Sequence, residues 1–545
     1  MKRSNRFLAA VLAMAAVTGL ACVVCFAASG PAAAPSPVGR APKIQPDYAD
    51  VVIPPNIAPL NFLVREDGSR YRVRIAARQG DSISIESRSA KITISEKSWR
   101  KLLAANRGRE LAFEVQVQTD AGWRRFNPFR MTVANEDIDR YLAYRRIHPA
   151  HSAWRDMGIY QRDLATFAET AILTNDYFRG GCVNCHTFRN NRADAMLVSV
   201  RSADYGNSAV IVRDGKPEKV GATFGYASWH PSGKILVYTS MKVVQFLHPT
   251  SDEVRDVIDL DSLLFYYEVQ SQKIGTAPDL AKKDRLETYP TWSPDGRYLY
   301  FCSAPRTWTS NNAIPDGYGQ VRYDLMRIAY DPNQGAWGQA ETVLSAKDTG
   351  KSILLPRISP DGRWLLVSMC DYGCFPVYQK SSDLYLIDLE EKSEVSSAKL
   401  EARAGTTEGE ASDFTLHTSH FRLLPINSDQ SESWHSWSSN SRWIAFSSKR
   451  DSGLFTRTYL SYVDPNGVAH KPFVLPQEDP TAYDSCLWTY SVPELVVEPV
   501  QAAQETLGRV VRGSRKISVQ MPITMATPKA DTTPQSGTPY LSGRE

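Results

Sequence analysis

Two cysteines and a histidine stand close together in the run Cys182-Val183-Asn184-Cys185-His186. Thiols three residues apart on one helical turn can form thioethers with the two vinyl groups of a haem, and the next residue then presents its imidazole to the iron. The run therefore predicts one covalently attached c-type haem. Cys182 and Cys185 are the expected attachment sites, and His186 is the expected proximal iron ligand.

The sixth ligand of the iron would decide what such a haem does. A methionine would raise the reduction potential and suit electron transfer, a histidine would lower it, and an empty position would permit ligand binding. Met196, ten residues after His186, is the first candidate for the distal ligand. The remaining candidates are Met157, His148 and His151 before the motif, and His230, Met241 and His248 after it.

Two other kinds of site use a pair of cysteines with this spacing. A zinc site needs a second pair of ligands, and His417 and His420 are the pair whose spacing comes nearest. A redox dithiol is expected beside a βαβ pattern, which the sequence lacks. Haem attachment is therefore the favoured interpretation, with zinc and the dithiol as its alternatives.

The first residues of the chain are typical of an export signal. Lys2, Arg3 and Arg6 precede an apolar run from Phe7 to Ala28, and small residues follow it. At about 22 residues the run is long enough to cross a bilayer, so residues 1–28 are expected to be a signal peptide or an N-terminal membrane anchor. Either outcome places the rest of the chain in the periplasm or cell envelope, where c-type haem would be attached.

The chain has 545 residues, of which 42% are hydrophobic. This length and composition are expected to give two or three domains. Residues 29–46 are rich in Ala, Pro and Ser and are expected to form a linker. Apolar residues alternate with polar ones within residues 47–134, which predicts a small β-sandwich-like domain. The spacing of Ile138, Tyr141 and Leu142 predicts a helical segment over 135–195 that carries the haem motif. Residues 500–545 are expected to be a disordered tail.

One pattern recurs four times between residues 196 and 499. The copies are YASWHPSGKILVYTS from Tyr226, YPTWSPDGRYLYFCS from Tyr289, PRISPDGRWLLVS from Pro356 and HSWSSNSRWIAFSS from His435. Each has an apolar residue, a turn, a basic residue and an alternating strand, which predicts a repeated hairpin. Weaker strands at both ends suggest six blades closed by the two ends of the repeat region, with five or seven as alternatives. In the fourth copy Ser438–Ser441 replace Ser-Pro-Asp-Gly, so the geometry of that turn is open.

The repeat W-S-P-D-G-R-x-L-x-F resembles that of TolB-like β-propellers, and the resemblance implies a mainly β fold. A wider resemblance rests on IPPNIAPLNF from Ile53, GIYQRDL from Gly158, CVNCHTF from Cys182 and the run that contains the fourth repeat. These segments resemble an envelope family common in Bacteroidetes and related anaerobes, which combines a small β-domain, one CxxCH motif and TolB-like repeats. That family has a Met and then a His shortly after the motif. Met196 fits this pattern, whereas Ser199 stands where the His would be.

Other residues are candidates for supporting roles. Cys370 and Cys374 flank a short loop and would form either a local disulfide or two buried thiols. Lys449, Arg450 and Arg457 would line a propeller mouth and receive an anion, or would be solvated loop charges.

The charge balance narrows the range of partners. With 63 basic and 59 acidic residues the net charge is +4, which argues against nucleic acid as a partner. The favoured function is one-electron transfer with a redox or envelope protein docked on the propeller or the small domain. The alternative is a haem sensor or a protein-binding scaffold. Whether the protein is an enzyme stays open, although hydrolysis is disfavoured because the sequence has no Gly-x-Ser-x-Gly nucleophile motif.

Overall fold

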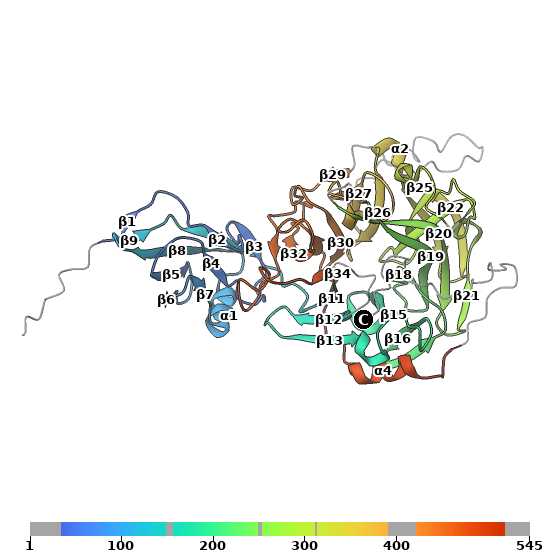
Figure 1. Ribbon diagram of the computed structural model, residues 1–545, viewed down its shortest axis with the longest axis horizontal. Coiled ribbons are helices and arrows are strands. Elements are labelled where there is room, and N and C mark those ends of the chain that lie inside the picture. Colours follow the sequence, from blue (N-terminus) through green and yellow to red (C-terminus); the bar gives the residue numbers. More distant parts are fainter. Residues whose placement is uncertain (1–33, 149–155, 249–252, 311–312, 391–420, 518–545) are drawn as a thin grey trace, which may run out of the picture.

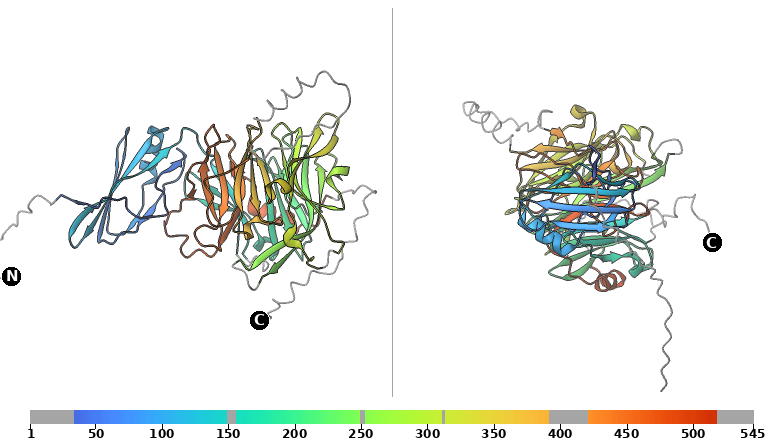
Figure 2. Two further views of the ribbon diagram at one scale, coloured as in Figure 1. Left: turned by 90° about the horizontal axis from the view of Figure 1, so that it is seen from above. Right: turned by 90° about the vertical axis from the view of Figure 1, so that its left-hand side faces the viewer.

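The computed structural model describes residues 34–148, 156–248, 253–310, 313–390 and 421–517. The expected signal or anchor over 1–28, His151, His417 and His420 lie outside these residues. Among the described residues no helix is long and apolar enough to span a membrane. The molecule is mainly β and elongated, with a small N-terminal domain at one end and a propeller-like body at the other (Figure 1, Figure 2).

The N-terminal domain consists of two sheets and one helix around a shared core. The larger sheet contains β1 (Ser36–Pro37), β9 (Gly122–Arg125), β8 (Glu110–Thr119), β10 (Phe129–Val133), β3 (Val51–Ile53), β5 (Arg70–Ala77) and β6 (Ile83–Ser87). The smaller sheet contains β2 (Ile44–Gln45), β4 (Phe62–Val64) and β7 (Lys91–Ile92). Phe62 packs edge-on against Phe113 and Phe129 of the larger sheet, and Trp99 of α1 (Glu96–Ala105) closes the core. β1 and β2 lie within the predicted linker of residues 29–46, so the described part of that segment belongs to the domain.

Six sheets of four antiparallel strands each form the propeller-like body within the described residues (Figure 1). The first sheet contains β13 (Glu169–Thr174), β12 (Gly158–Asp163), β11 (Tyr141–Ile147) and β34 (Thr489–Val496). The second contains β14 (Cys182–Arg189), β15 (Arg192–Arg201), β16 (Ser208–Arg213) and β17 (Lys216–Val220). The third contains β18 (Ala227–Trp229), β19 (Ile235–Leu247), β20 (Arg255–Glu268) and β21 (Lys273–Gly275).

The other three sheets contain the last three copies of the sequence repeat. The fourth sheet contains β22 (Arg285–Trp292), β23 (Tyr298–Pro305), β24 (Asp324–Asp331) and β25 (Ala336–Leu344). The fifth contains β26 (Ser352–Ile358), β27 (Trp364–Cys370), β28 (Asp383–Asp388) and β29 (Phe421–Leu423). The sixth contains β30 (Glu432–Trp437), β31 (Trp443–Ser448), β32 (Arg457–Tyr462) and β33 (Phe473–Val474). The short helices are η2 (Asn175–Phe178), η3 (Pro278–Leu280), η4 (Tyr318–Gln320), α2 (Ala346–Thr349), η5 (Pro376–Tyr378) and α4 (Gln504–Arg512).

The prediction of a helical segment over 135–195 is wrong. Within the described residues of that range, Tyr141–Ile147, Gly158–Asp163 and Glu169–Thr174 form the strands β11, β12 and β13, and the motif lies in β14. One 3-10 turn, η2, is the only helical element that the structure describes there. The reason is that β11 is buried on both faces, with Leu142, Ala143 and Tyr144 all nearly inaccessible. Apolar residues on a strand that is buried on both sides no longer alternate, and their spacing then resembles that of a helix.

The chain closes the ring of sheets by joining its two ends. β34, from the C-terminal side, pairs antiparallel with β11 and completes the first sheet. The strands of the propeller-like body therefore begin at Tyr141 rather than at Met196. The described part of the predicted disordered tail also has structure, because α4 buries Leu507 and Val511 against the core between the first two sheets.

The turn of the fourth repeat copy has the same geometry as the others. Ser441 adopts a φ of 61°, like Gly296 and Gly362 at 72° and 82°. Ser438 Oγ donates to Asn440 Oδ1 at 2.6 Å, as Ser293 does to its Asp. The departure from the repeat has a structural reason, because this turn binds the connection from the N-terminal domain. Asn440 Nδ2 donates to the backbone oxygen of Asp137 at 2.7 Å, which an aspartate would not do.

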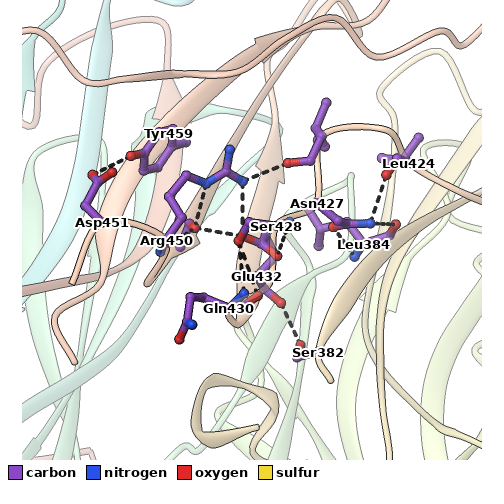
Figure 3. A network of polar contacts seen from close by, with 12 residues as sticks. Ser382, Leu384, Leu424, Asn427, Ser428, Gln430, Glu432, Arg450, Asp451 and Tyr459 are labelled. Atoms are coloured by element: carbon purple, nitrogen blue, oxygen red, sulfur yellow. Dashed lines mark hydrogen bonds and ion pairs between the residues drawn. The ribbon is translucent and has the colours of Figure 1, made fainter. Parts of the chain in front are cut away.

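A buried network of polar side chains joins the fifth and sixth sheets (Figure 3). Glu432 is inaccessible to solvent and pairs with Arg450 at 3.0 Å. Its carboxylate also accepts hydrogen bonds from Ser428 Oγ and Ser448 Oγ, both at 2.7 Å. Because each oxygen is satisfied, this charge can be buried within the fold.

Candidate functional site

The three motif residues lie on β14, the strand of the second sheet nearest the axis of the body. Cys182, Cys185 and His186 are 5%, 9% and 3% exposed. The pairing of β14 with β15 breaks its register between Asn184 and Thr187, and Cys185 has a φ of 53°. An extra residue in one strand, with an unusual backbone conformation, is a β-bulge, and bulges redirect side chains. Cys185 and His186 consequently both border one cavity, although neighbours on a regular strand face opposite sides.

The same bulge recurs around the axis. Tyr289, Leu355, Trp434 and Val492 have φ between 48° and 54°, and the strand pairing breaks its register at or beside each of them. All four border the cavity together with Cys185. The run from Cys185 to Phe188 thus corresponds to YPTW in the second repeat copy. The motif therefore lies inside a further, divergent copy of the repeat.

The cavity lies where these strands converge, and it has room for about 30 Å³ of water. Its walls combine aromatic and cationic side chains. Tyr226, Tyr289 and Trp434 form a cluster, with Tyr226 4.4 Å from Tyr289 and 5.4 Å from Trp434 between ring centroids. Arg145 of β11 and Arg357 of β26 also border it. Aromatic walls with a small number of convergent polar groups are typical of ligand sites.

His186 is a buried imidazole held in its neutral form. Burial, together with the positive charges of Arg145 and Arg357, lowers its pKa to about 3, while the backbone of Val492 acts in the opposite direction. Neither ring nitrogen has a hydrogen-bond partner of good geometry. His435 occupies the equivalent position in the sixth sheet, and its Nε2 lies 3.1 Å from the backbone oxygen of Leu366. His186 therefore differs from His435 in keeping a neutral nitrogen available for a metal.

The two cysteines have different surroundings. Burial raises the pKa of the Cys185 thiol to about 11, and Cys182 lies close enough to contribute to that shift. Cys182, whose pKa burial also raises, packs in a small apolar cluster with Ile147 and Met157 and does not border the cavity. Reactive dithiols have lowered thiol pKa values, so these surroundings do not favour the redox dithiol.

Met196 lies in the core on β15, opposite Phe188, and is fully buried. Met196 pairs with Phe188 across its hairpin. In the other copies of the repeat, the residue that pairs in the same way with the corresponding Trp or Ile is Leu236, Leu299, Leu365 or Ile444. Met196 does not border the cavity. The downstream histidines have other partners, because His230 contacts Ser232 and the Gly296 backbone oxygen and His248 contacts Asp256.

The basic residues expected at a propeller mouth are engaged elsewhere. Lys449 Nζ lies 2.5 Å from Glu253, and burial lowers its pKa to about 8. Arg450 pairs with Glu432, and Arg457 donates to the backbone oxygens of Trp488 and Cys486.

The two arginines of the cavity were not among the predicted site residues. Nothing in the sequence pattern pointed to Arg145. Arg357 did leave a signal, because it stands where the other quoted copies of the repeat have Ser or Thr.

The remaining cysteines that the structure describes form no disulfide. Cys370 and Cys374 are buried thiols in one apolar cluster with Cys302. Cys370 Sγ lies 3.3 Å from the backbone oxygen of Tyr372. Of the two alternatives for this pair, the structure therefore has the buried thiols.

The donor set around His186 contains the residue types that attach a c-type haem. His417 and His420, the second ligand pair of the zinc alternative, lie outside the described residues. No group of three or more His, Cys, Asp or Glu side chains lies close enough to hold a metal ion within the described residues. One neutral imidazole beside two neutral thiols is what haem attachment needs, because the porphyrin supplies the other iron ligands. The cavity, at about 30 Å³, is smaller than a porphyrin.

Comparisons with known proteins leave the family open. No protein-family description matches the chain, and no curated protein is similar to it. Among solved structures it is similar to hydrazine synthase of Kuenenia stuttgartiensis, with 12% identity, a TM-score of 0.33 and coverage of 64% of this chain and 91% of that one. It is similar to prolyl oligopeptidase B of Galerina marginata, with 9% identity, a TM-score of 0.32 and coverage of 67% and 42%. It is also similar to oligogalacturonate lyase of Vibrio parahaemolyticus, with 11% identity, a TM-score of 0.28 and coverage of 57% and 84%. At these scores none of the three carries an argument about function.

Proposed function

We propose that the protein is an exported monohaem c-type cytochrome built on a six-bladed TolB-like propeller with a small sandwich-like N-terminal domain. Cys182 and Cys185 form the thioethers, and His186 is the proximal iron ligand. The protein acts in the periplasm or cell envelope, and it exchanges one electron with a protein partner docked on the propeller or the small domain. The apolar run of residues 7–28 supports export, with or without a single-pass anchor.

One observation carries the proposal. His186 is 3% exposed, and neither of its buried ring nitrogens has a hydrogen-bond partner of good geometry. A buried polar group without a partner costs about 1–3 kcal/mol, so such groups in folded proteins call for an explanation. A bond from one nitrogen to iron supplies it, and the adjacent Cys185 on the same bulge provides the covalent attachment.

The attached group would supply reversible one-electron chemistry at the iron. The residues of this chain have other tasks. His186 is held neutral near pH 7, because burial and the charges of Arg145 and Arg357 lower its pKa to about 3. The rings of Tyr226, Tyr289 and Trp434 exclude bulk water from the axis and lower the local dielectric, which tunes the reduction potential.

A second function, a haem sensor that binds a small ligand, is favoured by one specific observation. Among the described residues that border the cavity, no methionine and no histidine other than His186 is present. The two ligand types that complete electron-transfer haems would then be absent from the cavity lining, and an open sixth position would bind small molecules.

The test is expression of the full chain in a host that matures c-type cytochromes. The mature protein should carry the mass of one haem and show a Soret band that survives denaturation. The Cys182→Ser/Cys185→Ser chain should show neither, whereas Cys302→Ser, a matched change at a buried core thiol, should keep both. A bare peptide mass in the wild type would refute the proposal. Reversible reduction of a low-spin haem supports electron transfer, and carbon monoxide uptake by a high-spin haem supports the sensor.

A further inference from the structure

Two arginines converge on the axial cavity from different sheets. Arg145 comes from β11 of the first sheet and Arg357 from β26 of the fifth, and both border the space beside His186. Neither belongs to the cysteine motif. Two cations at one small cavity create a local positive potential, and the chain must compensate for it or leave it for a ligand.

In the part of the chain that the structure describes, no hydrogen-bonded carboxylate compensates for these charges. Arg145 donates to the side-chain oxygens of Asn184 and Ser491, which are neutral, the second at 3.0 Å. Arg357 forms a long ion pair with Glu494, whose Oε1 lies 3.7 Å from Nη2, and burial raises the pKa of this carboxyl to about 7, so it compensates the arginine only in part. This distance is too long for a hydrogen bond. Guanidinium groups in such surroundings are suited to bind an anion through charge-assisted hydrogen bonds.

The dimensions of the cavity limit the size of that anion. Each water molecule needs roughly 10–15 Å³ of such space. The cavity offers about 30 Å³. It therefore holds about two water molecules, and a group of three heavy atoms, such as a carboxylate, fills that volume. His186 adds a neutral and unpartnered imidazole at the wall, which can donate a hydrogen bond to the same anion.

We infer that the axial cavity is a binding site for a carboxylate or a similarly small oxyanion, held between Arg145 and Arg357 beside His186. The site goes beyond the proposed haem attachment, because its cations come from β11 and β26 and not from the motif strand. The carboxylate has two possible sources, a free anion from solution or the propionate of a porphyrin attached at the cysteines.

Calorimetric titration of formate into the full chain tests this inference, with the mature protein and the Cys182→Ser/Cys185→Ser chain in parallel. The expected result is saturable binding in at least one of them, which Arg145→Gln or Arg357→Gln abolishes. Arg297→Gln is the matched control, because that side chain is 76% exposed on a propeller turn.

The two chains distinguish the sources of the carboxylate. Binding in both identifies a free anion as the occupant. Binding in the cysteine variant alone identifies the carboxylates of the attached group, which already fill the site in the mature protein. No binding in either chain, or binding that both glutamine variants retain, overturns the inference. Should a glutamine variant fail to fold, Arg145→Lys and Arg357→Lys keep the charge but lose the paired donors, so formate affinity should still fall. The mass of the mature protein shows separately whether a haem has been attached.

Discussion

Glu432 lies at the start of β30, fully buried, and its replacement by glutamine tests how much its ion pair with Arg450 stabilises the fold. Four polar contacts surround the carboxylate: hydrogen bonds from Ser428 N, Ser428 Oγ and Ser448 Oγ, and the ion pair with Arg450 (Figure 3). Glutamine has nearly the same shape. It removes the negative charge and one acceptor while Arg450 stays in place.

The size of the effect follows from the burial of the two partners. Breaking a buried ion pair by removing one partner costs about 3–5 kcal/mol, because the other charge is left uncompensated. The Arg450 side chain is 18% exposed, and it keeps its hydrogen bonds to Ser448 Oγ and to the backbone oxygen of Ile426. The expected cost of Glu432→Gln is therefore at the lower end, about 3 kcal/mol of the free energy of unfolding.

Urea unfolding followed by intrinsic fluorescence measures this cost, with the midpoint and the slope both recorded. Arg213→Gln serves as a control in the same propeller-like body. The side chains of Arg213 and its ion-pair partner Glu218 are 42% and 43% exposed. A pair so exposed should contribute little. The double change Glu432→Gln/Arg450→Gln should cost less than the sum of the single changes, since the pair is coupled. A cost below about 1 kcal/mol for Glu432→Gln would refute the reasoning, because a neutral hydrogen bond would then account for the site.

Three further outcomes follow from individual side chains. Met196→Leu should cost less than about 1.5 kcal/mol, because swaps between methionine and leucine nearly conserve volume. Leucine occupies the same position in other copies of the repeat, so Met196 is expected to be a core side chain and not an iron ligand. The change should therefore leave the visible spectrum of the mature protein as it is, and loss of a Met-to-iron band would contradict this expectation. Asn440→Asp restores the repeat sequence, yet in thermal unfolding it should destabilise the protein by about 0.5–1.5 kcal/mol, the value of one exposed hydrogen bond. The change removes the bond to Asp137 O and sets a carboxylate against it. Burial raises the pKa of Asp259 from 3.8 to about 7. Between these two pKa values the folded state therefore binds more protons than the unfolded state. The free energy of unfolding consequently falls as the pH rises from one pKa value to the other. Asp259→Asn should accordingly lose less stability than the wild type between pH 5 and pH 8. An equal loss in the two proteins would show that Asp259 does not lower the stability as the pH rises.

The strands of the propeller-like body were predictable wherever apolar and polar residues alternate along a hairpin. The four quoted copies coincide with the pairs β18–β19, β22–β23, β26–β27 and β30–β31. Prediction failed at β11 to β14. Of these strands, β11 and β14 have consecutive buried residues and so lose the period of two. The divergent copy around the motif was also missed, because Cys185 and His186 replace the Tyr-Pro of the second copy and Arg189 replaces its Ser.

The sequence predicts the residues that could carry the chemistry of the candidate site, but it does not predict which side chains surround them. Cys182, Cys185 and His186 follow from spacing alone, whereas Arg145 and Arg357 reach the axis through pairings between strands far apart in the sequence. No local pattern encodes a contact of that kind. Met196 was a plausible ligand by its distance along the chain, but a β-hairpin places it opposite Phe188, in the layer of apolar side chains between sheets.

The repeat itself accounts for the position of the chemistry. In the five innermost strands that carry the bulge, the left-handed residue borders the axial cavity whatever its type, as Tyr289, Leu355, Trp434 and Val492 show beside Cys185. A cysteine at that position needs no special local structure to reach the centre of the body. Its neighbour, which is proline in three other sheets, becomes a histidine whose nitrogens the scaffold leaves without partners. Two substitutions within one copy of a structural repeat are therefore enough to place a thiol and a neutral imidazole at the axis, and Arg145 and Arg357 supply the charge around them.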